Sequence, residues 1–206
     1  MAKKDVIVGF VLDMSCSMDS IRKQTIDGFN EYIDSLKMDE SSDIRFCFTL
    51  FNSSKIDVKS AIPVSKVKAL SYSTYMPDAL TPLYDAVGDM IMSIHELDEL
   101  VDKVLLVIMT DGLENFSKRY TFKTISALIK ECQDEYDWGV VYLGANQDAW
   151  AVGTSIGIPG ANTYTYQSTP VGVTNTFKDV INSTQGYITS TEEPKGFFEP
   201  TTSSNK

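Results

Sequence analysis

Hydrophobic positions along the chain follow two patterns that alternate from one segment to the next. Continuous apolar runs rich in Val, Ile, Leu and Phe are typical of strands that are covered on both faces. These runs occupy residues 6–12, 44–51, 104–109 and 139–143. Apolar residues spaced three and four positions apart predict amphipathic helices instead. That spacing runs through residues 19–37, 83–97, 122–132 and 170–181.

Two shorter segments complete the predicted sheet. Residues 55–58 follow a turn at 52–54 and are expected to pair antiparallel with the strand before it. Residues 162–167 are expected to form an edge strand. Because strands that alternate with helices are typical of parallel sheets, we predict the fold class α/β. The expected fold is doubly wound, with a mostly parallel central sheet, one short antiparallel strand and helices on both faces.

The apolar pattern stops near residue 187. Thr, Ser, Glu and Pro dominate from there to the last residue, a composition typical of segments that bury too little apolar surface to fold. The length of 206 residues suits one domain. We therefore predict a single domain over residues 1–186 and a disordered tail over residues 187–206.

Composition narrows the classes of partner. The chain has 18 Lys and Arg against 28 Asp and Glu, a net charge of −10, which disfavours binding to nucleic acid or to anionic membranes. The longest apolar run covers residues 6–12, far shorter than the roughly 20 residues of a membrane span. Three scattered cysteines do not form a disulfide framework, so a cytoplasmic location is expected. The sequence leaves the oligomeric state open.

Oxygen-bearing side chains gather where two predicted strands end and one helix begins. Asp13, Ser15 and Ser17 follow the first strand, Thr81 precedes the helix that starts at residue 83, and Asp111 follows strand 104–109. Ligands bind at the carboxyl ends of the strands in sheets of this class. Carboxylate and hydroxyl oxygens suit Mg²⁺ or Mn²⁺, and the absence of neighbouring His or Cys pairs argues against Zn²⁺. One divalent cation, Mg²⁺ or Mn²⁺, is therefore the expected cofactor.

This order of motifs, D-x-S-x-S, then Thr, then T-D-G, resembles the metal-ion-dependent adhesion site of the von Willebrand factor A (vWA) domain family over residues 5–185. Residues 83–86, 110–115 and 143–148 are similar to stand-alone bacterial and phage members. The resemblance implies direct metal contacts from Ser15, Ser17 and Thr81, with Asp13 and Asp111 acting mainly through water. It also implies a partner protein whose Asp or Glu completes the metal coordination. The expected function is metal-dependent protein binding without catalysis.

Two departures from the family pattern keep other interpretations open. Cys16 stands where the family usually has Gly, and residues 78–80, Asp-Ala-Leu, replace a segment that usually carries Gly. A positive φ at Cys16 would cost roughly 1–2 kcal/mol. A metal-free scaffold with a decayed site is therefore one alternative, and a metal-assisted phosphoester hydrolase is a weaker one, since no general base is evident. Glu114 and Asn115 are expected to face solvent rather than to extend the site.

Overall fold

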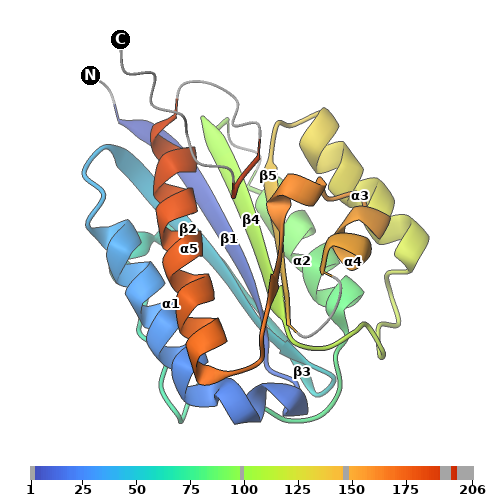
Figure 1. Ribbon diagram of the computed structural model, residues 1–206. Helices are drawn as coiled ribbons and strands as arrows, with labels where there is room; N and C mark the ends of the chain where they lie inside the picture. Colours follow the sequence, from blue (N-terminus) through green and yellow to red (C-terminus); the bar gives the residue numbers. More distant parts are fainter. Residues whose placement is uncertain (1–2, 98–99, 146–148, 191–195, 199–206) are drawn as a thin grey trace.

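The computed structural model has a central sheet with helices on both faces (Figure 1). It describes residues 3–97, 100–145, 149–190 and 196–198. Within these residues the six strands lie in the order β3-β2-β1-β4-β5-β6. Only β3 runs antiparallel to its neighbour among the paired strands described. The strands are β1 (Lys4–Asp13), β2 (Ser42–Asn52), β3 (Lys55–Pro63), β4 (Lys103–Thr110), β5 (Gly139–Ala145) and β6 (Thr163–Tyr166). The predicted fold class is confirmed.

Two layers of helices cover the sheet. Helices α1 (Arg22–Lys37) and α5 (Pro170–Thr189) pack side by side on one face (Figure 1). Helices α2 (Leu83–His95), α3 (Phe122–Asp134) and α4 (Ala149–Ser155) cover the other face. In the described part of the chain, three short 3-10 helices lie at Cys16–Ile21, Val64–Lys66 and Gly160–Asn162.

Aromatic side chains fill the core between the sheet and the pair α1 and α5. Phe10 of β1 packs edge-on against Phe29 of α1, with ring centroids 5.6 Å apart, and lies parallel to Phe177 of α5 at 6.3 Å. The two helices approach closely at Gly28, where a Cβ atom would lie 2.2 Å from the Phe177 ring. The absence of a side chain at Gly28 therefore allows α5 to dock against α1.

Strand β3 is longer than the sequence predicts. It continues to Pro63, beyond the expected end at residue 58, and its pairing with β2 changes register between Phe46 and Phe48. As the exposed edge of the sheet, β3 buries little of its surface. Its second half therefore lacks the apolar signal by which a buried strand is recognised.

Helix α5 also extends beyond the predicted domain boundary at residue 186, to Thr189. Lys4 donates to the carbonyls of Ile188, Thr189 and Ser190, at 2.8–3.2 Å, and Lys103 donates to those of Tyr187 and Ser190. Two lysines from the starts of β1 and β4 thus satisfy the last carbonyls of the helix, a contact that local sequence does not reveal.

Part of the predicted disordered tail can be placed. Phe197 is buried and its backbone N–H donates to Asn162 Oδ1 at 2.8 Å. Residues 191–195 and 199–206 lie outside the described part of the chain, as do residues 146–148 at the end of the segment 143–148 named in the sequence analysis. None of the described helices is both long enough and apolar enough to cross a membrane.

Candidate metal centre

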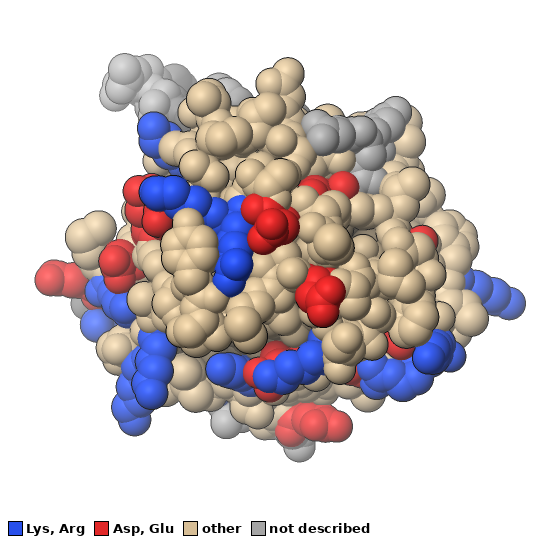
Figure 2. Space-filling view, turned by 90° about the horizontal axis from the view of Figure 1, so that it is seen from below, with Lys and Arg blue, Asp and Glu red and all other residues tan. Residues whose placement is uncertain are grey.

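The predicted site lies at the carboxyl edge of the sheet, where β1 and β4 end beside each other. The two strands pair in parallel up to Leu12 and Met109, so Asp13 and Thr110 follow at neighbouring positions. Figure 2 views this edge: uncharged side chains cover most of it, and acidic and basic side chains are scattered rather than gathered into a patch of one sign. Any strong charge at the site itself must therefore come from a few individual groups rather than from a charged surface patch.

Asp13 is fully buried at the centre of the site. Its Oδ1 accepts a hydrogen bond from the Ser15 backbone N–H at 2.7 Å, and its Oδ2 accepts one from the Thr110 hydroxyl at 2.6 Å. Burial raises the pKa of Asp13 from 3.8 to about 6, although these hydrogen bonds oppose the rise. The carboxylate is therefore rigidly held and poorly solvated.

The other four predicted residues lie around Asp13. The Ser15 and Ser17 hydroxyls are 3.2 Å apart, and Ser17 donates to Asp111 Oδ1 at 2.5 Å. A Cβ atom placed on Gly112 would lie 3.1 Å from Thr81 Oγ1 and 3.8 Å from Ser17 Oγ, so these two hydroxyls face the same small space. Burial also raises the pKa of Asp111, against the hydrogen bond from Ser17. The structure thus brings the oxygens of Asp13, Ser15, Ser17, Thr81 and Asp111 into one cluster.

The composition of this cluster suits a hard divalent cation. It contains two carboxylates and three hydroxyls, and neither carboxylate forms a salt bridge with another described residue. The cluster differs from sites built only from His, Cys, Asp and Glu: within the described chain no group of three or more such side chains could hold a metal ion. Oxygen-only ligands with few charges favour Mg²⁺ or Mn²⁺ over softer metals.

The loop that carries Thr81 is fixed by residues expected to face solvent. Asn115 Oδ1 accepts from the Thr81 backbone N–H at 2.9 Å, and the Asn115 N–H donates to the Thr81 carbonyl at 3.1 Å. Glu114 accepts from the Tyr84 N–H at the start of α2, also at 2.9 Å. Glu114 therefore caps a helix, while Asn115 positions a candidate ligand.

Three further residues support the site and were not assigned to it from the sequence. Besides holding Asp13, Thr110 lies beneath Tyr166, whose hydroxyl donates to the Thr110 carbonyl at 3.3 Å. Tyr75 donates to the Asp13 carbonyl at 2.6 Å. Both tyrosines are buried, so they form the floor of the site rather than a binding surface. The threonine of T-D-G is the one signal that could have identified part of this layer.

The two departures from glycine have different structural consequences. Cys16 opens a 3-10 helix and is not among the described residues with positive φ, so it carries no left-handed strain. Ala79 has a φ of +64°, and its carbonyl accepts a hydrogen bond from the Cys16 N–H at 3.1 Å. The left-handed backbone strain that the sequence predicted for Cys16 is therefore found at Ala79 instead.

Replacing Ala79 with Gly is expected to raise stability by about 0.5–1 kcal/mol. Relief of the left-handed strain, roughly 1–2 kcal/mol, outweighs the added flexibility of the unfolded chain, about 0.4–1 kcal/mol. Thermal unfolding should show a midpoint higher by about 1–4 °C. Cys16→Gly is the matched control and should lower the midpoint, because Cys16 has no such strain to relieve. A lower midpoint for Ala79→Gly would contradict the assignment of strain.

Asp85, in the first turn of α2, anchors the loop that follows Asp111. Its carboxylate accepts backbone N–H groups of Lys118, Arg119 and Tyr120 at 2.9–3.0 Å. Burial alone would raise the pKa of Asp85, but these bonds and the nearby Arg119 guanidinium outweigh it and lower the pKa below 3.8. Asp85 therefore ties the chain after β4 to the helix that begins beside Thr81.

The stabilisation from Asp85 should depend on pH. Because its pKa is lowered in the folded state, the contribution is present above pH 3.8 and is lost as the pH falls through the folded pKa. Asp85→Asn should lower the free energy of unfolding by about 2–3 kcal/mol at pH 7. In urea titrations that deficit should shrink below about pH 4. Asp89→Asn, which breaks a more exposed ion pair with Arg119, should cost less than about 1 kcal/mol, and an equal cost for both variants would contradict this role.

Comparisons with known proteins bear on the fold. No family model matches the chain, and no curated protein matches its sequence. Among solved structures, it is similar to the vWF domain of the type V pili tip protein Mfa5 from Porphyromonas gingivalis, at 10% identity and a TM-score of 0.67, covering 94% of this chain and 99% of that one. The chain is also similar to a von Willebrand factor type A structure from Catenulispora acidiphila, at 12% identity and a TM-score of 0.60. That match covers 90% of this chain and 43% of the other.

The PilB minor pilin from Streptococcus sanguinis is also similar, at 13% identity and a TM-score of 0.65. The match covers 94% of this chain but 64% of the pilin, so the chain spans less than two thirds of that protein. At these identities the likeness concerns the fold alone. The chain has a vWA-like fold.

Proposed function

We propose that the protein is a metal-dependent protein-interaction module, which binds Mg²⁺ or Mn²⁺ and then an Asp or Glu side chain of a partner protein. The observation that carries the proposal is the cluster formed by Asp13, Ser15, Ser17, Thr81 and Asp111 at the carboxyl edge. The vWA-like fold supports it, because one of the similar structures is the vWF domain of a pilus tip protein.

The chain's own residues divide the work of binding. Ser15, Ser17 and Thr81 would hold the cation directly, while Asp13 and Asp111 would act mainly through water. Asp13 is already fixed by the Ser15 N–H and the Thr110 hydroxyl, which leaves little motion to arrest on binding. When bound, the cation supplies positive charge that attracts an incoming carboxylate, and hydroxyl ligands leave that charge largely uncompensated.

The surface around the cluster suits a protein partner. Large apolar side chains stand exposed on loops of the same edge: Tyr72 and Met76 are each 57% exposed, Leu80 45% and Leu113 59%. Apolar side chains on one surface are common where proteins bind each other. A carboxylate of the partner could reach the cation while neighbouring apolar residues cover this rim.

The position of the single histidine supports binding without catalysis. His95 ends α2, at the opposite edge of the sheet from Asp13. The side chain most often used for general acid–base catalysis is therefore remote from the cluster. The proposal accordingly includes no chemical step, and the predicted cytoplasmic location stays a prediction.

A peptide display library tests the proposal. The full chain is immobilised, the library is panned in millimolar Mg²⁺, and bound peptides are eluted with EDTA. Selected peptides should contain Asp or Glu, and replacing that residue with Asn or Gln should abolish binding. Peptides that bind equally well with EDTA present, or without an acidic residue, would instead support the metal-free scaffold.

A further inference from the structure

A cavity of about 470 Å³ opens at the amino edge of the sheet, between the ends of α2 and α3 and the starts of β1 and β4. Its volume falls in the usual range for ligand sites. Buried apolar side chains form its floor: Ile7, Ile94, Val104 and Trp138. The cavity lies at the amino edge, whereas the candidate metal cluster lies at the carboxyl edge, and the two share no residue.

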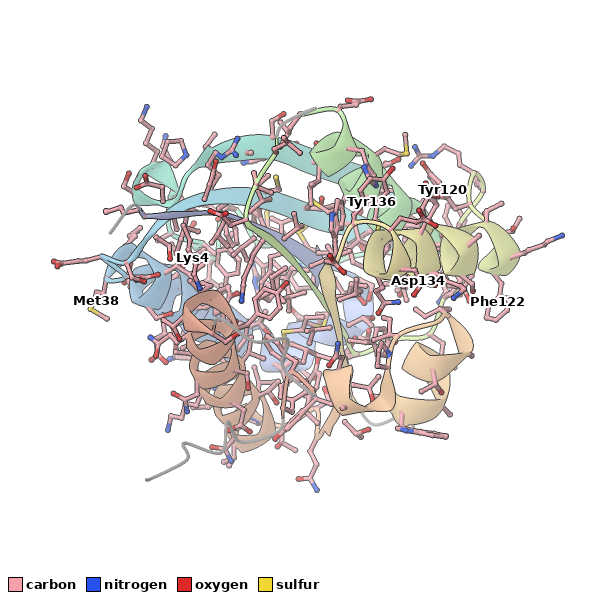
Figure 3. The ribbon with its side chains drawn as sticks, turned by 90° about the horizontal axis from the view of Figure 1, so that it is seen from above. Lys4, Met38, Tyr120, Phe122, Asp134 and Tyr136 are labelled. Carbon is pink, nitrogen blue, oxygen red and sulfur yellow. The ribbon has the colours of Figure 1, made fainter. Side chains whose placement is uncertain are left out.

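Three aromatic rings form one wall of the cavity. The His95 ring stacks on Trp138 with centroids 4.8 Å apart and planes 24° apart, and it meets the edge of Tyr136 at the same distance. Cys132 Sγ lies 3.8 Å from His95 Nε2 on the side of α3. Trp138 is buried while Tyr136 is 51% exposed, so the wall runs from the floor to the rim. In Figure 3, Tyr136 lies beside the end of α3, on the other side of the sheet from Lys4.

The charges around the cavity have one dominant sign. Asp102, Glu135 and Asp137 line it, and all three are exposed. The Asp102 carboxylate accepts the Asp5 N–H at 2.8 Å and so is held in place. Helices α2 and α3 also end beside the cavity. Because helix C-termini carry partial negative charge, they add to the negative charge of the three carboxylates.

The one Lys or Arg among the lining residues does not neutralise this charge. Lys103 directs its ammonium group to the opposite face of the sheet, where it donates to the Tyr187 and Ser190 carbonyls at 2.5 and 2.9 Å. The cavity thus combines an apolar floor, an aromatic wall and carboxylates at the mouth. This combination suits a cation on an apolar stem.

We propose that this cavity binds the guanidinium group of an arginine side chain presented by a partner protein. Guanidinium is planar and stacks on aromatic rings, such as that of Tyr136, while its N–H groups reach carboxylates in a fixed geometry. A lysine ammonium is more strongly hydrated and lacks the planar face. The chain would then contact basic partners at the amino edge, independently of acidic partners at the carboxyl edge.

The test uses the full chain with Trp150→Phe, which leaves Trp138 as the only tryptophan. The probe is the peptide acetyl-Gly-Arg-Gly-amide. Its matched controls carry citrulline, an uncharged isostere of arginine, or lysine at the same position. Trp138 fluorescence and its indole N–H resonance should change saturably with the arginine peptide, weakly with lysine and not with citrulline. Equal responses to arginine and citrulline, or no saturable response, would overturn the proposal.

Variants locate the contact. Glu135→Gln combined with Asp137→Asn should weaken binding by about threefold to tenfold. Asn suits position 137, where φ is +54°, because it tolerates left-handed backbone. Asp43→Asn, which removes an exposed carboxylate outside the cavity, should leave affinity unchanged, as should EDTA. Unchanged affinity in the double variant would overturn the site, whereas loss of metal binding would leave it intact.

Discussion

Adding millimolar Mg²⁺ or Mn²⁺ to the metal-free protein is expected to raise its thermal unfolding midpoint by about 5–10 °C. A ligand that binds only the folded state stabilises it by about 2.7 kcal/mol at 100 times its dissociation constant. For a domain of this size each kcal/mol corresponds to roughly 2–4 °C. The reason is specific to this fold: Asp13 is buried and forms no salt bridge with another described residue, and a cation nearby would offset the cost of burying its charge. Differential scanning fluorimetry in EDTA, Ca²⁺, Mg²⁺ and Mn²⁺ measures the shift.

Paired variants separate loss of the cation from loss of the fold. Thr81→Val removes one hydroxyl at nearly constant shape and should abolish most of the shift, whereas Thr81→Ser keeps the hydroxyl and should retain it. Asp13→Ala should abolish the shift as well, and Asp43→Ala, at an exposed carboxylate far from the cluster, should not. No shift in the unmodified protein, or the same shift in Thr81→Val, would contradict the proposed site and favour the metal-free scaffold.

Replacing Gly28 with Ala is expected to destabilise the protein by about 1–2 kcal/mol. Ala favours helix over Gly by up to about 1 kcal/mol, so local propensity predicts the opposite sign. The added Cβ would lie 2.2 Å from the Phe177 ring, which is itself buried and stacked near Phe10. Since inserting atoms into a packed core forces rings and helices to move, the cost of overpacking exceeds the gain in propensity. Urea unfolding followed by circular dichroism measures the difference.

Gly186→Ala provides the matched control for Gly28. It is the same substitution within a helix, but a Cβ there would have no neighbour within 4 Å. It should therefore stabilise the protein by up to about 1 kcal/mol. If both variants shifted stability in the same direction, close contact between α1 and α5 would not be the determining factor.

The sequence predicts the buried parts of this fold better than its edges. Strands β1, β4 and β5 are apolar on both faces, so their positions follow from continuous apolar runs in the sequence. The parallel sheet follows from the alternation of these runs with helices. The second half of β3 escapes prediction because an exposed edge strand lacks an apolar pattern. The last turn of α5 escapes prediction because its partners are distant in sequence. The α5 turn depends on Lys4 and Lys103, and no local pattern encodes that contact.

The candidate site divides in the same way. The oxygens proposed as ligands can be predicted because Asp13, Thr81 and Asp111 each lie at a strand end or a helix start. The residues that position them cannot, since Asn115 and Asp85 act on backbone N–H groups about 30 residues away in sequence. The strain at Ala79 is likewise a property of the closed loop: its carbonyl must reach the Cys16 N–H, and nothing in Asp-Ala-Leu indicates this.

The anchoring of α5 at the amino edge also determines how the protein can be tethered to a surface. Lys4 contacts the end of α5, and Phe197 packs beside Tyr187 with ring centroids 6.4 Å apart, so the first and last described segments lie at the same edge (Figure 1). A sensor chip coupled near either segment would present the carboxyl edge to solution. The same coupling would crowd the cavity beside Tyr136, so arginine-bearing peptides should be measured with the protein free in solution.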